Sequence, residues 1–205
     1  MIIKARHNPF FDRFFSFYSR NGLKRHFHRV LFDCTADTAN RPVLLIGNHF
    51  SWWDGFISYR VNDLCLHKKF HIMMLEEQLE NRLFLNKAGA FSIKRGSRSV
   101  VESLQYASGL LHEGENLVAV YPQGTIASLH RRPVRFEKGV ERIIAGASEK
   151  LMILFYVALP DWFSEKKPSL TVRVIEYAAR ERSASDLEET YNMFLDECIT
   201  RQIPS

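Results

Sequence analysis

The feature that most constrains the fold is a short apolar run, Val43 to Ile46, that ends at Gly47. Consecutive apolar residues closed by a glycine are typical of a strand buried on both faces, as in the parallel sheets of α/β proteins. A histidine and an aspartate follow at His49 and Asp54. Because open α/β sheets carry their sites just beyond the carboxyl ends of such strands, we expect the functional site directly after Ile46.

His49 and Asp54 have the chemistry of a general base and its orienting partner. A neutral imidazole titrates at about pH 6.5 and can accept a proton from a hydroxyl, while a carboxylate on its other nitrogen fixes the tautomer. Two side chains five residues apart on one helix would point about 140° apart. We therefore expect His49 in the turn and Asp54 in the first turn of the next helix. Ser51 is the expected N-cap, with Asp54 three residues later as in a capping box.

The same residues allow a purely structural interpretation, in which Asp54 only caps a helix and His49 is an ordinary loop histidine. A metal site is not expected, because the other histidines form no pair with the spacing of metal ligands. The chain also lacks the G-x-S-x-G elbow of serine hydrolases, which disfavours that class of enzyme.

Strand-like apolar runs alternate with helical segments along the rest of the chain. Strands are expected at residues 43–46, 70–74, 90–94, 117–121, 152–159 and 170–176, and helices at 54–61, 76–86, 97–112, 136–149 and 186–201. This alternation predicts a single α/β domain, residues 35–205, with a mixed, mostly parallel sheet flanked by helices.

Residues 1–34 are expected to form an N-terminal amphipathic helix pair. Pro9 to Arg20 should be the first helix, capped by Asn8, and Asn21-Gly22 should end it before a second short helix that reaches Leu31. Residues 1–32 hold seven Lys and Arg but one Asp, while the whole chain has a net charge of +5. Phenylalanines on one face and cations on the other suit a membrane interface with anionic lipids, or packing of the aromatic face on the sheet.

Composition excludes several classes of protein. No stretch approaches the about 20 apolar residues that span a bilayer, and residues 1–32 offer no charge-free apolar segment typical of a secretory signal. Three cysteines without a C-x-x-C spacing are expected to be reduced thiols in a cytoplasmic setting. Nucleic-acid binding is not expected, because the basic residues share their helices with phenylalanines.

Four blocks in order resemble the glycerolipid acyltransferase family, which comprises the 1-acylglycerol-3-phosphate and lysophospholipid acyltransferases. Asn48-His49 with Asp54 resembles the first block, NH-x4-D. Gly89 to Arg95, GAFSIKR, is similar to the second block. Tyr121 to Thr125, YPQGT, is similar to the third, which usually reads FPEGT, and Phe136 to Gly139, FEKG, to the element that follows it.

The resemblance implies transfer of a fatty acyl group from acyl-CoA or acyl carrier protein, without a further cofactor, to a hydroxyl of a lysophospholipid or related lipid. His49 would be the general base, oriented by Asp54. In such enzymes an N-terminal helix pair docks on the bilayer, so residues 9–32 are expected to bind membrane lipids. The implied location is the cytoplasmic face of a membrane, as a peripheral protein.

The resemblance also implies a set of substrate-binding residues: Asn48, Ser51, Lys94, Arg95, Arg98, Gln123, Gly124 and Thr125. Arg95, with Arg98 beside it, is the implied phosphate ligand, because a guanidinium binds phosphate bidentately. Backbone N–H groups near Gly124 and Thr125, with Lys94 or Arg95, are candidate donors to the developing oxyanion. The alternative is that the three cations form only a solvated rim.

Two departures from the family pattern leave the acceptor open. Gln123 replaces the usual glutamate of the third block, and Ile126 replaces a common arginine. Loss of a carboxylate and a cation leaves the base and its partner in place. The sequence therefore also allows a catalytically inactive lipid-binding protein of the same fold.

Overall fold

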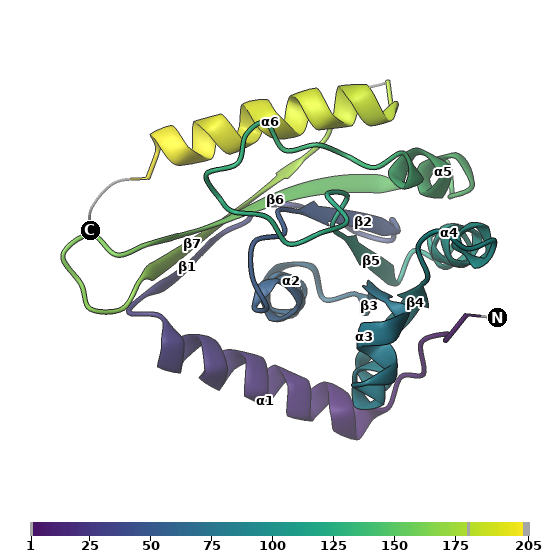
Figure 1. Cartoon of the computed structure of the whole chain (residues 1–205), viewed down its shortest axis with the longest axis horizontal. Helices are drawn as coiled ribbons and strands as arrows, with labels where there is room; N and C mark the ends of the chain where they lie inside the picture. Colours follow the sequence, from purple (N-terminus) through teal and green to yellow (C-terminus); the bar gives the residue numbers. More distant parts are fainter. Residues whose placement is uncertain (1, 180, 203–205) are drawn as a thin grey trace.

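A sheet of seven strands forms the centre of the computed structural model, which describes residues 2–179 and 181–202 (Figure 1). The strands of this part of the chain are β1 Val30–Asp33, β2 Val43–Gly47, β3 Lys69–Leu75, β4 Ala90–Ile93, β5 Asn116–Val120, β6 Met152–Asp161 and β7 Ser169–Glu176. Their order is β1-β7-β6-β2-β5-β3-β4. The β6–β7 pair is antiparallel and the other neighbouring pairs are parallel. The predicted mixed, mostly parallel sheet is confirmed.

Helices cover both faces of this sheet (Figure 1). They are α1 Pro9–His26, α2 Asp54–Val61, α3 Glu76–Glu80, α4 Ser99–Leu110, α5 Gly139–Ala145 and α6 Ala184–Thr200, with a π-helical turn η1 at Asn62–Leu66 and a 3₁₀ helix η2 at Leu83–Ala88. Within the described residues, no helix has the length and apolar character needed to cross a membrane.

Strand β2 lies near the middle of the sheet. This location explains why its residues are all apolar, with no alternation of polar and apolar side chains. Val43 and Leu45 face a core shared with α1 and α2, whereas Leu44 and Ile46 face a core shared with α4, α5 and α6. All four side chains are fully buried. A strand with a hydrophobic core on each face needs apolar side chains at every position.

The prediction of an N-terminal helix pair is wrong. Helix α1 continues through Asn21 and Gly22 to His26, and residues 30–33 form β1, paired with β7 at the sheet edge. A Cβ on Gly22 would lie 3.0 Å from the ring of Trp53, so the glycine allows close packing against that ring and does not break the helix. The sheet therefore begins before residue 35, and Phe15 and Leu23 of α1 belong to its core.

Two further helices are shorter than predicted. The segment 76–86 is helical in α3 only as far as Glu80 and continues as the separate 3₁₀ helix η2. The segment 136–149 is helical only in α5. By contrast, α2 has the predicted bounds, because its start and its apolar residues are set by local sequence.

Candidate active site

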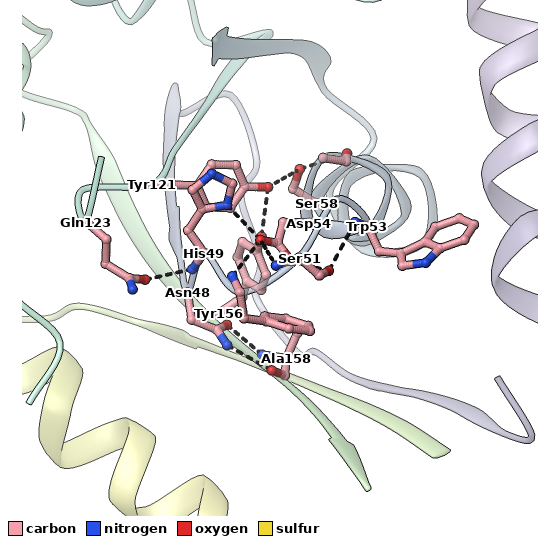
Figure 2. A network of polar contacts seen from close by, with 12 residues as sticks. Asn48, His49, Ser51, Trp53, Asp54, Ser58, Tyr121, Gln123, Tyr156 and Ala158 are labelled. Carbon is pink, nitrogen blue, oxygen red and sulfur yellow. Dashed lines mark hydrogen bonds and ion pairs between the residues drawn. The ribbon is translucent and has the colours of Figure 1, made fainter. Parts of the chain in front are cut away.

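His49 and Asp54 meet directly beyond the end of β2, as their spacing predicts. The turn after Gly47 carries His49, and Asp54 is the first residue of α2. The His49 Nδ1 atom lies 2.7 Å from Asp54 Oδ2 (Figure 2). The His49 side chain is 24% exposed and that of Asp54 is 1% exposed. The imidazole is thus accessible while its carboxylate partner is buried.

Asp54 is held by hydrogen bonds besides that from His49. Its Oδ2 atom accepts the backbone N–H groups of Phe50, at 2.8 Å, and Ser51, at 2.9 Å, and its Oδ1 atom accepts the Ser51 hydroxyl at 3.0 Å (Figure 2). These donors satisfy the buried negative charge. Because Asp54 only accepts, Nδ1 of the neutral imidazole carries the proton and Nε2 is left as the basic nitrogen.

Ser51 differs in part from the predicted N-cap. Asp54 does reach back to the Ser51 N–H, as in a capping box. The Ser51 hydroxyl, however, accepts from the N–H of Trp53 at 3.0 Å, and α2 begins only at Asp54. Its hydroxyl is therefore engaged inside the turn that presents His49.

Asn48 and Gln123 hold this turn in place. The Asn48 amide is buried and exchanges two hydrogen bonds of 2.9 Å with the backbone N–H and C=O of Ala158 in β6. Gln123 accepts the backbone N–H of His49 through Oε1 at 2.7 Å, and the His49 C=O accepts from the N–H of Ala127 at 2.9 Å. The two amides that the sequence assigned to substrate binding are thus bonded to the protein backbone around the histidine (Figure 2).

Two tyrosines that sequence reasoning missed complete the surroundings of His49. The ring of Tyr121 stacks on the imidazole, and its hydroxyl donates to Ser58 at 3.1 Å and accepts from the Tyr156 hydroxyl at 3.0 Å. Burial, and then the nearby Asp54 carboxylate, raise the pKa of Tyr121, and burial raises the pKa of Tyr156. Both hydroxyls therefore stay protonated at neutral pH. The one sequence signal that could have identified Tyr121 as a site residue is its position as the first residue of the third block.

Gly47 has a steric role at the end of β2. A Cβ at this position would overlap the ring of Tyr156, which is fully buried beside the strand. The glycine that ends the apolar run thereby makes room for the tyrosine behind Tyr121. This explains why β2 stops at a glycine immediately before the site.

The predicted cations lie in different environments. Arg95 donates to the C=O of Gly124, whose φ of +67° places it in the left-handed region. Lys94 pairs with Glu76 at 3.1 Å. Arg95, Gly124 and Thr125 line the same cavity as His49, whereas Lys94 and Arg98 are not among its lining residues. Of the three predicted cations, Arg95 therefore shares the cavity of His49, and Lys94 and Arg98 do not.

This cavity has a volume of about 850 Å³. Its polar lining includes His49 and Arg95, and most of its wall is apolar. Apolar lining residues include Phe15, Phe56, Phe70, Ile72 and Phe84. A basic imidazole nitrogen, a guanidinium and a large apolar volume suit a ligand with a reactive polar group and a long hydrocarbon part.

Comparisons with known proteins agree with this geometry. The sequence model of the family described as Acyltransferase matches residues 24–158, which include His49, Asp54 and all four sequence blocks. The crystal structure of the 1-acyl-sn-glycerophosphate (LPA) acyltransferase PlsC from Thermotoga maritima is similar, with a TM-score of 0.65 and 13% sequence identity, covering 95% of this chain and 81% of that one. At this identity the likeness is one of fold. No curated protein sequence matches the chain.

Proposed function

The chain belongs to the acyltransferase family, as its sequence blocks predict, and we propose that it moves a fatty acyl group from acyl-CoA or acyl carrier protein to a hydroxyl of a lysophospholipid or related lipid. The observation that carries this proposal is the 2.7 Å contact between His49 and Asp54 at an apolar cavity of about 850 Å³. The base suits a hydroxyl, and the cavity suits a fatty chain.

In the proposed reaction, the acceptor hydroxyl gives its proton to Nε2 of His49 as its oxygen attacks the thioester carbonyl carbon. The carbon–sulfur bond then breaks, His49 gives its proton to the leaving thiolate, and the free thiol departs. Asp54 stabilises the imidazolium between these steps. General-base catalysis of this kind contributes about 10²–10⁴-fold.

The developing oxyanion also requires a hydrogen-bond donor. The N–H of Gly124 already donates to the C=O of Tyr121 at 2.9 Å, and Lys94 is paired with Glu76. Of the predicted donors, we therefore favour the Arg95 guanidinium and the backbone N–H of Thr125. Arg95 also remains the proposed ligand of a phosphate on the acceptor.

We further propose that α1 docks the enzyme on the cytoplasmic face of a membrane, as a peripheral protein. Phe10, Phe14 and Phe17 are exposed on this helix, and so are Arg13, Arg20 and Lys24. Exposed aromatic side chains interleaved with cations fit the boundary between headgroups and acyl chains of anionic lipids. The cavity is lined in part by Phe15 on the buried face of the same helix, which favours entry of lipid from that side.

The test is thioester consumption by the purified protein against a panel of lipid acceptors, for wild type and His49→Ala. We expect acceptor-dependent thiol release that falls about 10²-fold or more in the variant. Equal rates for the two proteins would refute acyl transfer by His49.

Gln123→Glu then discriminates between acceptors. Glutamate retains an oxygen that can accept the His49 N–H, so the variant is expected to keep the turn. A gain of activity with lysophosphatidate would indicate an enzyme diverged in acceptor choice. Lipid binding without thioester turnover in either protein would instead indicate an inactive lipid-binding protein.

A further inference from the structure

The connection between β6 and β7 projects two aromatic side chains into solvent. Trp162 is 57% exposed and Phe163 is 42% exposed. Phe163 has a φ of +45°, a left-handed conformation that residues other than glycine rarely adopt, and the turn is closed by the Glu165 N–H donating to the Trp162 C=O at 2.8 Å. Large exposed aromatic residues on a strained, ordered turn are typical of contact sites.

This hairpin follows the carboxyl end of β6, on the same side of the sheet as the carboxyl end of β2 and the candidate active site. Strand β6 runs parallel to β2 and pairs with its last residue, Gly47, through Tyr156. It then continues to Asp161, so the hairpin lies beyond the strand end that carries His49. In Figure 1 the hairpin, the green loop on the left, lies beside the end of α1 and the start of β1.

Contacts join the hairpin to the carboxyl end of α1. Lys167 Nζ donates to the C=O of Arg25 at 2.7 Å, and the N–H of His28 donates to the C=O of Pro168 at 2.8 Å. His28 Nδ1 also lies 3.6 Å from a carboxylate oxygen of Glu165. The aromatic tip is thus held at one end of the helix that exposes Phe10, Phe14 and Phe17.

Exposed cations outnumber acidic residues on the hairpin and at the end of α1. The exposed Lys and Arg residues on the hairpin and around the carboxyl end of α1 are Lys24, Arg25, Arg29, Lys166 and Lys167. Of the hairpin acids, Glu165 lies against His28, and Asp161 ends β6. Exposed aromatic side chains on a segment rich in cations complement a surface that presents anionic headgroups above hydrocarbon.

We propose that the β6–β7 hairpin is a second lipid contact, which inserts Trp162 and Phe163 into an anionic bilayer beside α1. This inference rests on the proposed membrane docking of the enzyme. Two separated contacts, a helix lying in the interface and an aromatic tip, fix the orientation of the protein on the bilayer. Together they direct the active-site edge of the sheet toward the membrane.

The test measures sedimentation with vesicles of phosphatidylcholine alone, and with vesicles in which phosphatidylglycerol replaces part of that lipid. The variant is Trp162→Ser/Phe163→Ser. The matched control is Met193→Ser, because Met193 is 67% exposed on α6, on the opposite side of the sheet from α1 (Figure 1). We expect the double variant to bind the anionic vesicles about tenfold more weakly, and the control to bind like wild type.

A second variant tests the charge. Lys166→Glu is expected to weaken binding to the anionic vesicles and to leave binding to phosphatidylcholine unchanged, with a difference that shrinks as salt is added. Wild-type binding by the double variant, or an equal loss in Met193→Ser, would overturn the proposal. So would concentration-dependent self-association of wild type that the double variant lacks, because the tip would then be a protein interface.

Failure of this inference can be told apart from failure of the proposed reaction. Thioester turnover with detergent-dispersed acceptor needs no bilayer, so the double variant is expected to match wild type there. Turnover by wild type equal to that of His49→Ala in this assay would refute acyl transfer and leave the vesicle result standing. Normal turnover with unchanged vesicle binding in the double variant would refute only the hairpin contact.

Discussion

The ring of Tyr121 lies flat against the imidazole of His49, with ring centroids 4.6 Å apart and planes inclined by 15°. The two residues follow neighbouring parallel strands, β2 and β5. Asp54 fixes one nitrogen of the imidazole, and the tyrosine fixes the plane of the ring. Ser58 and Tyr156 in turn fix the tyrosine through its hydroxyl (Figure 2).

Removing this stacking should slow catalysis without weakening substrate binding. We expect Tyr121→Leu to lower kcat about tenfold with little change in KM, because a tilted imidazole is misplaced relative to the acceptor hydroxyl. Tyr121→Phe retains the stacked ring, so its kcat should fall less than that of Tyr121→Leu, although the Tyr156 hydroxyl loses its acceptor. Steady-state kinetics with varied acceptor measures both constants, and a Tyr121→Leu enzyme with the kcat of wild type would contradict the positioning role.

Replacing the carboxylate of Asp54 should remove the charge that stabilises the His49 imidazolium. In Asp54→Asn the amide oxygen can keep the Oδ2 position, where it accepts the N–H groups of Phe50 and Ser51 and the Nδ1 proton of His49, but it carries no negative charge. We expect kcat to fall about 10²-fold or more. Because Asp54 is buried, circular dichroism and thermal unfolding must accompany the kinetics. A folded variant that retains wild-type kcat would show that Asp54 only caps the turn.

Asn48→Ala should destabilise the protein as well as the site. The substitution leaves the N–H and C=O of Ala158 without their side-chain partner at a buried position. An unsatisfied buried group costs about 1–3 kcal/mol, so we expect the free energy of unfolding to fall by about 2 kcal/mol or more. Urea denaturation measures this change. Thr38→Ala, at another buried polar position, serves as a comparison.

Stability should also depend on pH through His71. Burial, and then the nearby His7, lower the pKa of His71 to about 4 from a usual value of 6.5. Between pH 4 and pH 6.5 the unfolded chain therefore binds more protons at His71 than the folded chain does. The contribution of His71 to the free energy of unfolding is fully present above pH 6.5 and is lost as the pH falls toward 4. The loss amounts to roughly 3 kcal/mol at most.

The measurement for His71 is urea denaturation at several pH values, with His71→Gln as the comparison. The variant should show a smaller fall in unfolding free energy between pH 6.5 and pH 4, because the group that gains a proton on unfolding is absent. Parallel curves for the two proteins would contradict the assignment to His71.

The parts of the fold that sequence predicts are those set by neighbours along the chain. The apolar run of β2 and the turn signals around His49 are local, so the strand, the start of α2 and the His49–Asp54 contact follow from a few residues. The sequence places Val30 and Leu31 in the predicted second helix, because a short apolar segment fits a helix or a strand equally well when its partner strand is unknown. That partner, β7, begins near residue 169.

The contacts around the imidazole could not be predicted from local sequence either, because they join residues far apart in the chain. Gln123 meets the His49 backbone 74 residues later in the chain, and Ala158 meets Asn48 110 residues later. A polar side chain beside a predicted catalytic histidine resembles a substrate ligand until the strand order is known. Only the placement of β2 between β5 and β6 shows that both amides bond backbone groups.

The reversal of direction between β6 and β7 has a mechanical consequence. A parallel successor would have required a crossover connection, whereas this chain turns back in a short tip. The backbone from Trp162 to Ala158 spans only roughly 13 Å. Ala158 in turn forms two hydrogen bonds with the Asn48 amide, next to His49. If the tip enters lipid as proposed, a displacement of the tip on the bilayer is transmitted along β6 to Asn48, the neighbour of the proposed base His49.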